Sequence, residues 1–211
     1  MNVLLKVVAG LLCVVGVARA DVTAPDVLIR STAQEIISIV KQDADIKAGN
    51  QKKILALVDA KILPNFDFAR MTQLAMGKHW REASAEQKQV LVTEFRNMLV
   101  RTYTKAFTSY RDQTVEVLPL KMAAEDNEAT VKMRVVKSGS PQPTTVDYRM
   151  KKKTDGWKVF DVIIEGVSMV TSYRGTFDTQ VSQSGIEGLI KTLQDMNAKA
   201  SNTSLRKADA K

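Results

Sequence analysis

The apolar residues of this chain change their spacing twice along the sequence, and this constrains the fold more than any other feature. Between Leu91 and Tyr110 they recur at every third or fourth position, whereas between Val115 and Ile164 most of them alternate with polar residues. A period near 3.6 residues places apolar side chains on one face of a helix, and a period of 2 places them on one face of a strand. Helical spacing returns after Val167. The pattern predicts an α+β fold, with helices packed on one face of a curved, mainly antiparallel sheet of four or more strands.

Four strands are expected in succession, joined by short turns. Alternation is clearest over residues 129–135 and 146–150, as is typical of half-buried strands. Asp155-Gly156 indicates a tight hairpin turn, because these residue types tolerate the positive φ that such turns require. The segment from Trp157 to Ile164 is apolar on both faces, so we expect this last strand to lie centrally in the sheet.

An apolar stripe predicts the first helix. Its members are Ile29, Ala33, Ile36, Ile37 and Val40, which fall on one helical face. Gly49-Asn50 interrupts this region, and a second short helix should end before Pro64 because the residue ahead of a proline avoids helical angles. A third short helix is expected to end near Gly77.

The longest helix is expected to start at Ser84. Ser84 and Gln87 have the spacing of a capping box, in which each side chain satisfies a free backbone N–H group of the other. C-terminal helices are predicted over 167–181 and, after a glycine, over 186–196. Residues 201–211 are polar, and we expect them to form a disordered tail.

The first 20 residues have the pattern of an export signal peptide. Lys6 precedes an apolar run over 7–17, which is followed by Ala18-Arg19-Ala20, a small-x-small cleavage pattern. The apolar run is shorter than the about 20 residues that a membrane-spanning helix needs. We therefore expect export, cleavage after Ala20, and a single folded domain over 21–200.

Cleavage would remove Cys13, the one cysteine in the sequence, and would lower the formal net charge from +8 to +6. A basic chain raises the possibility of nucleic acid as a partner, but export and the lack of aromatic residues among the basic ones argue against it. Attraction to anionic membranes, attraction to acidic proteins, and a merely soluble basic surface all remain open. Lys151-Lys152-Lys153 can likewise form a solvated hairpin tip or contact a head group or an acidic partner.

The mature sequence offers little for catalysis or metal binding. His79 is the single histidine, no G-x-S-x-G or Gly-rich phosphate loop is present, and Asp43-Ala44-Asp45 lacks the glycine and the remaining ligands of a calcium loop. We therefore expect no enzyme activity, no metal and no cofactor. Asp161 and Glu165 lie about 13 Å apart if they share a strand, so we expect each to anchor local structure by accepting hydrogen bonds.

Five segments closely resemble the MlaC family of toluene-tolerance proteins, and the resemblance extends over roughly residues 25–200. The segments are PNFDFARM (64–71), GKHWR (77–81), SAEQK (84–88), DYR (147–149) and WKVFDVIIEGVSMV (157–170). The resemblance implies a periplasmic phospholipid carrier without enzyme activity, whose helices and curved sheet enclose an apolar lipid cavity and leave the head group in solvent.

The resemblance also implies partners. Such carriers take a glycerophospholipid as cargo and shuttle it between an outer-membrane lipoprotein–porin complex and an inner-membrane ABC transporter with an MCE-domain ring, which helps to maintain outer-membrane asymmetry. No other cofactor and no nucleic acid is implied, and a monomer suits a diffusing shuttle.

The candidate lipid-binding residues combine the apolar faces of the predicted sheet and helices with this resemblance. They are Met98, Leu99, Tyr103, Phe107, Val131, Met133, Val146, Tyr148, Met150, Val167, Met169, Val170 and Tyr173. Periodicity alone does not distinguish a cavity wall from a filled core. An exported enzyme, or a chaperone-like interaction protein with a filled core, therefore remains an alternative.

Overall fold

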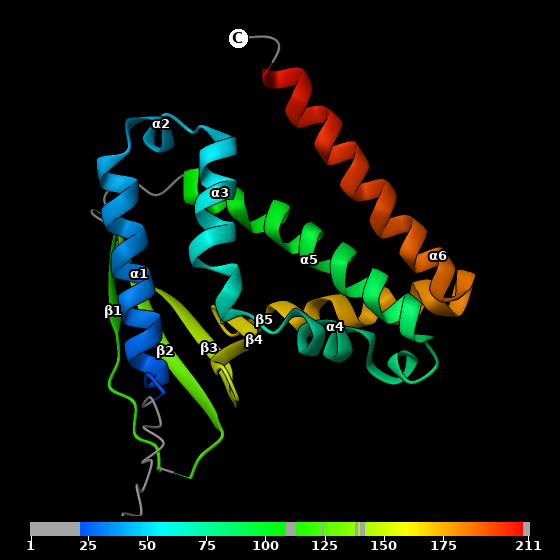
Figure 1. The fold of residues 1–211 in the computed structure, drawn as a ribbon, viewed down its shortest axis with the longest axis horizontal. Coiled ribbons are helices and arrows are strands. Elements are labelled where there is room, and N and C mark those ends of the chain that lie inside the picture. Colours follow the sequence, from blue (N-terminus) through cyan, green and yellow to red (C-terminus); the bar gives the residue numbers. More distant parts are fainter. Residues whose placement is uncertain (1–21, 109–112, 124, 138, 140–141, 209–211) are drawn as a thin grey trace, which may run out of the picture.

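The computed structural model describes residues 22–108, 113–123, 125–137, 139 and 142–208, without the side chains of 105–108 and 201–208. The predicted signal peptide lies outside these residues. Figure 1 shows an open sheet with helices against one face, and a second group of helices that extends away from the sheet. Within the described ranges, no helix combines the length and apolar character that crossing a bilayer requires.

The sheet has five antiparallel strands in the order of the sequence. They are β1 Gln113–Val117, β2 Glu128–Lys137, β3 Thr144–Lys153, β4 Gly156–Ile164 and β5 Val167–Ser168. The first four match the predicted meander, and the Asp155-Gly156 turn signal lies at the β3–β4 hairpin. The fifth strand corrects the prediction for Val167, which was assigned to a helix. Val167 pairs with Ile164 across a tight turn, and the helix starts only at Met169.

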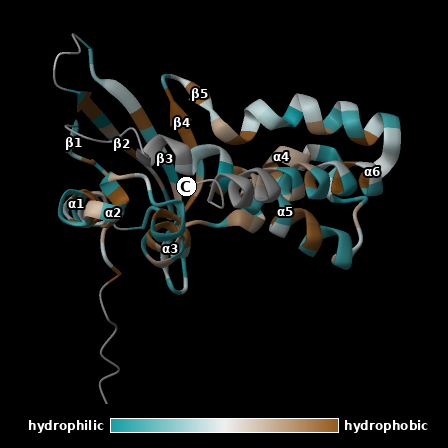
Figure 2. Cartoon of the chain, turned by 90° about the horizontal axis from the view of Figure 1, so that it is seen from above, coloured by the Kyte–Doolittle hydropathy of each residue, from teal (hydrophilic) through white to brown (hydrophobic). Residues whose placement is uncertain are grey.

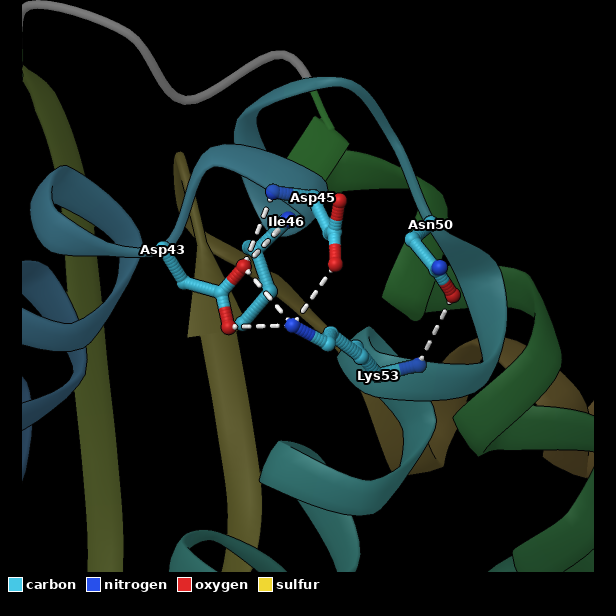
Figure 3. A network of polar contacts seen from close by, with 5 residues as sticks. All are labelled: Asp43, Asp45, Ile46, Asn50 and Lys53. Carbon is cyan, nitrogen blue, oxygen red and sulfur yellow. Dashed lines mark hydrogen bonds and ion pairs between the residues drawn. The ribbon is translucent and has the colours of Figure 1, made fainter.

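Three helices lie along one face of the sheet (Figure 2). They are α1 Pro25–Gln42, α2 Ala44–Lys47 and α3 Gln51–Lys61. The Asp43 side chain caps α2 by accepting hydrogen bonds from the backbone N–H groups of Asp45 and Ile46. Lys53 of α3 then pairs with Asp43 at 3.0 Å and with Asp45 at 2.8 Å (Figure 3). This network fixes the corner between α1 and α3, so the Asp43–Asp45 segment has a structural role here.

The second group of helices extends beyond the β4 side of the sheet. It consists of α4 Phe68–Met76, α5 Ala85–Thr108 and α6 Met169–Ala208, with 3-10 turns η1 Leu63–Asn65 and η2 Gly77–Trp80. The predicted capping box is present at the start of α5. The Ser84 N–H donates to Gln87 Oε1 at 2.7 Å, and the Gln87 N–H donates to Ser84 Oγ at 3.1 Å.

Helix α6 bends sharply at Gly185, where φ is 70° and ψ is −179°. This backbone region is accessible essentially only to glycine, and the bend lets the second half of α6 fold back toward α5 (Figure 1). The helix continues to Ala208, beyond the boundary that the polar composition suggested near residue 200. Extending an existing helix by one residue costs far less than nucleating a new one, so a polar sequence can continue it.

β4 lies near the sheet edge, which corrects the expectation of a central position. Beyond β4 there is only the two-residue β5, together with an isolated parallel bridge between Phe66 and Val159. The Asp67 N–H donates to the Val159 carbonyl at 2.8 Å. β4 is apolar on both faces because α4 and α6 also pack against it. The sequence indicated correctly that both faces of β4 are buried. The structure shows that helices α4 and α6 contribute to this burial, so it does not require a central position in the sheet.

Three separate apolar clusters stabilise the fold. The largest joins α4, α5 and α6, where the Phe95 ring contacts Phe177 edge-on with centroids 5.2 Å apart. A second joins α1 to the sheet around Val131 and Val159, both fully buried. A small third cluster, centred on Ile54, holds α1, α2 and α3 together. The space between the clusters is not completely filled.

Candidate binding cavity

A cavity of about 370 Å³ lies between the sheet and the helices and is partly open to the surface. Its volume is within the range of about 300–1,000 Å³ that small-molecule sites occupy. The sheet contributes one wall, made of Gln113, Val115, Met133, Val135, Val146, Tyr148, Val159, Val162 and Ile164. The helices and the η1 segment contribute the other wall, made of Ile29, Thr32, Ala33, Ile36, Ile37, Val40, Val58, Ile62, Leu63, Asn65, Phe66, Phe68, Met71, Leu99, Val100, Tyr103, Thr104 and Met169.

The local sequence explains why this wall is apolar. Strand alternation turns Val146 and Tyr148 of β3 inward, whereas Arg149 points outward and stacks over the Phe160 ring at 4.9 Å. The outer face of the sheet carries charged pairs such as Arg134–Glu116. None of the residues on the cavity wall is charged. The sheet therefore separates a charged outer surface from an apolar interior, because apolar and polar residues alternate along its strands.

Four residues on the wall carry a hydroxyl group, namely Thr32, Tyr103, Thr104 and Tyr148, and their partners differ. Thr104 donates to the carbonyl of Val100 in its own helix. Tyr103 is hydrogen-bonded to Tyr173, and burial is the main cause that raises the pKa of the Tyr173 phenol. Burial also raises the pKa of Tyr148 to about 12, so both phenols remain neutral at physiological pH.

Six of the predicted lipid-binding residues lie together on the cavity wall: Leu99, Tyr103, Met133, Val146, Tyr148 and Met169. Six others do not. Met98 and Val170 are buried in the α4–α5–α6 cluster, against which Tyr173 packs, and Val131 and Met150 are buried in the sheet cluster. Val167 is 62% exposed at the sheet edge. The side chain of Phe107 lies outside the described residues.

The sequence contained a signal for the opposite wall. All five members of the predicted α1 stripe, from Ile29 to Val40, line the cavity. This stripe was interpreted as a helix face and was not assigned to ligand binding, because nothing in the sequence indicates which space that face borders. Val58 of α3, and Ile62 directly after that helix, were missed for the same reason.

Three titratable residues outside the cavity that the sequence singled out, His79, Asp161 and Glu165, have structural partners. His79 is buried between Glu82 and Asp178, with each ring nitrogen 2.8 Å from a carboxylate oxygen. These contacts join η2 to α6, as expected for a packing residue. The predicted anchoring roles of Asp161 and Glu165 are confirmed, because Asp161 accepts hydrogen bonds from Ser168 and Val170, and Glu165 accepts one from the Thr145 N–H. Within the described ranges, no group of three or more His, Cys, Asp or Glu residues could hold a metal ion.

The lysine run is largely neutralised by acidic residues of the chain. Lys151 pairs with Glu128 at 3.0 Å, and Lys153 pairs with Asp67 at 2.7 Å. Asp67 also caps α4 by accepting a hydrogen bond from the Arg70 N–H. Lys153 therefore connects the β3–β4 hairpin to the start of α4, a role that differs from both the solvated tip and the external contact that the sequence allowed.

The family model described as MlaC protein matches residues 30–195, which is most of the chain. The chain belongs to the MlaC family. The match includes every strand and covers the cavity wall except Ile29. The predicted α+β fold and the predicted family are both confirmed.

Relatives of this MlaC-family chain have names that refer to lipid transport or solvent tolerance. The intermembrane phospholipid transport system binding protein MlaC of Haemophilus influenzae is 22% identical, and the match covers 82% of this chain and 81% of that protein. The toluene tolerance protein ttg2D of Pseudomonas putida is 25% identical, over 76% of this chain and 74% of its own length. A solved phospholipid-binding protein from Ralstonia solanacearum, in complex with a phospholipid, is 36% identical with a TM-score of 0.76, over 83% of this chain and 98% of that one.

Proposed function

We propose that this MlaC-family chain is a periplasmic phospholipid carrier that holds acyl chains in the cavity between its sheet and helices. The observation that carries the proposal is the uncharged, mainly apolar wall of that cavity, in a chain whose fold matches a solved protein in complex with a phospholipid. The open space between the layers counts against a chaperone-like protein with a filled core, and the lack of a recognised catalytic motif in the sequence counts against an exported enzyme.

The physics of lipid transfer requires such a cavity. Each methylene group costs about 0.8 kcal/mol to expose to water, so a lipid with two long chains cannot cross an aqueous space at a useful rate. A carrier must cover the chains and release them again, and it needs no bond-making chemistry to do so. Flexible methionines such as Met133 and Met169 on the wall suit irregular hydrocarbon ligands.

We propose that the six predicted residues on the wall, together with the α1 stripe, contact the acyl chains. The cargo is then a glycerophospholipid, and the protein needs no other cofactor. Met98, Val131, Met150 and Val170 would act indirectly, by holding the walls in place from the packed clusters.

The proposal includes export and handover. Residues 1–20 would act as a signal peptide cleaved after Ala20, and the mature protein would diffuse in the periplasm as a monomer. Its partners would be an outer-membrane lipoprotein–porin complex and an inner-membrane ABC transporter with an MCE-domain ring, and the pathway would maintain outer-membrane lipid asymmetry. The positive net charge of the chain would steer docking onto acidic surfaces, so association should weaken with added salt.

Native mass spectrometry of the mature protein purified from the periplasm tests this function. A mass excess equal to one or more phospholipids, identified after organic extraction, is the expected result. A bare polypeptide mass, with no uptake from phospholipid vesicles, would contradict the carrier function and favour the chaperone-like alternative.

A further inference from the structure

Tyr148 places a hydroxyl group on an otherwise apolar part of the cavity wall. It lies in the middle of the sheet, opposite Val131 of β2 and Val162 of β4 in the strand register. These neighbours have no side-chain atoms that could accept a hydrogen bond. Among the described residues, the Tyr148 hydroxyl has no hydrogen-bond partner, whereas the Tyr103 phenol on the opposite wall is paired with Tyr173.

The same hydroxyl has free space beside it. Burial raises the pKa of the phenol to about 12, although the residue as a whole is only partly buried. Every fully inaccessible side-chain nitrogen or oxygen in the described ranges has a partner. Since the Tyr148 oxygen has none, it must retain accessible surface, and because the residue lines the cavity, that surface faces the cavity.

Once lipid fills the cavity and displaces water, a hydroxyl without a partner is unfavourable, so a group of the cargo should accept its proton. A single trapped water would itself need two to four polar partners, and the side chains of the strand neighbours Val131 and Val162 offer none. Thr32 on α1 also has no partner among the described residues, but a helical threonine can turn its hydroxyl onto the carbonyl four residues before it. A tyrosine on a strand cannot make this local hydrogen bond, because its hydroxyl group lies at the far end of the ring.

The chemistry of the cargo narrows the choice of acceptor. Hydrocarbon chains accept no hydrogen bonds, and a charged phosphate would be strongly disfavoured on a wall without a cationic residue. The ester carbonyls that join acyl chains to glycerol are neutral acceptors next to the chains. They are the polar groups of a diacyl lipid that can enter an apolar cavity at the lowest cost.

We infer that the Tyr148 hydroxyl donates a hydrogen bond to an ester carbonyl of the bound lipid, which sets the depth of insertion and selects ester-linked over ether-linked phospholipids. This inference rests on the proposed carrier function and adds a specificity determinant to it. A dialkyl ether lipid has the same chains but lacks the carbonyl, so it would leave the hydroxyl unpaired.

A competition experiment tests the inference on the mature protein. Delipidated protein is incubated with vesicles that contain equal amounts of dipalmitoyl phosphatidylethanolamine and its dihexadecyl ether analogue, and the bound ratio is read by native mass spectrometry. A net hydrogen bond of this kind corresponds to about a three- to tenfold preference for the ester lipid. Tyr148→Phe should bring the ratio close to one, whereas Tyr173→Phe, which removes a phenol that does not line the cavity, should keep the preference.

An infrared measurement gives a second readout, which reports directly on the ester carbonyl. With ¹³C-labelled ester carbonyls, the wild-type complex should show a carbonyl band at lower frequency than a non-hydrogen-bonded ester, and Tyr148→Phe should lose it. Equal binding of the two lipids by the wild type, or the same ester preference in Tyr148→Phe, would overturn the inference and leave the carrier function intact. Binding of neither lipid would overturn the carrier function as well.

Discussion

The carboxylate of Asp161 on β4 accepts a hydrogen bond of 3.2 Å from the backbone N–H of Val170, in the first turn of α6. Ser168 donates a second hydrogen bond to the same carboxylate at 2.7 Å, and a guanidinium nitrogen of Arg149 lies 3.6 Å from it. The Asp161 side chain is only 1% exposed. One buried carboxylate therefore joins the sheet that forms one cavity wall to the helix that starts beside it.

Replacing Asp161 with alanine should destabilise the fold by about 2 kcal/mol, because it leaves the buried Val170 N–H without an acceptor. Asp161→Asn keeps an acceptor oxygen at that position, so a smaller loss is expected. Urea unfolding followed by circular dichroism measures both changes. Equal losses in the two variants would mean that the charge, and not the hydrogen bonds to α6, accounts for the effect.

Two glycines of α6 should respond in opposite directions to the same substitution. Gly185 adopts a backbone conformation that alanine tolerates poorly, so Gly185→Ala should cost about 1–3 kcal/mol. Gly175 lies in regular helix with open space where a Cβ would be added, so Gly175→Ala should stabilise the protein by about 0.5–1 kcal/mol. Thermal unfolding of the two variants provides the comparison. Similar effects at both sites would argue against a bend at Gly185 in solution.

The pKa of His79 should lie above its ordinary value. The hydrogen bond to Glu82 is the largest cause, and the hydrogen bond to Asp178 adds to it, although desolvation by burial and the nearby Lys78 act in the opposite direction. Because the folded-state pKa is raised, this contribution to stability is present below the unfolded pKa of about 6.5 and is lost as the pH rises through the folded value.

Proton NMR can measure this directly, since His79 is the only histidine in the sequence. Its ring signal should titrate above pH 6.5, and the pH dependence of stability over that window should flatten in His79→Gln. The pKa of Asp178 is lowered, chiefly by its hydrogen bond with Lys78 and then by His79. Its contribution to stability is therefore lost as the pH falls through its folded-state pKa. A ring signal that titrates at or below 6.5 would contradict the charged His79 contact.

A charge on the cavity wall should abolish lipid retention. Ile36 of α1 lines the cavity, whereas Gln34 on the same helix is exposed. Ile36→Glu should lower the amount of co-purified phospholipid by at least about tenfold, because an unpaired carboxylate is strongly disfavoured in an apolar space. Gln34→Glu adds the same charge outside the cavity and should retain the lipid. Native mass spectrometry measures both, and circular dichroism checks that Ile36→Glu is folded.

The sequence by itself determined the local elements. Apolar spacing placed the α1 stripe from Ile29 to Val40 on one helical face, and the Ser84–Gln87 pair marked the start of α5, which the structure confirms. These features depend on neighbours within about four residues, so periodicity and capping chemistry are sufficient to predict them. The quoted motifs were also sufficient to predict the family.

Only the tertiary structure decided which apolar residues border empty space. Val131 and Met133 lie two positions apart on the same face of β2 and both belong to the sheet cluster, yet only Met133 also lines the cavity. The surroundings of β4 near the edge were likewise decided by a segment distant in sequence, because Phe66 bridges to Val159. Val167, in contrast, enters a strand by pairing with Ile164 only three residues away, which the helical spacing of the apolar residues did not indicate. A hydrophobic pattern records that a side chain avoids water. Whether another side chain or a cavity lies opposite depends on how far apart the packed layers are held, and no local pattern contains that distance.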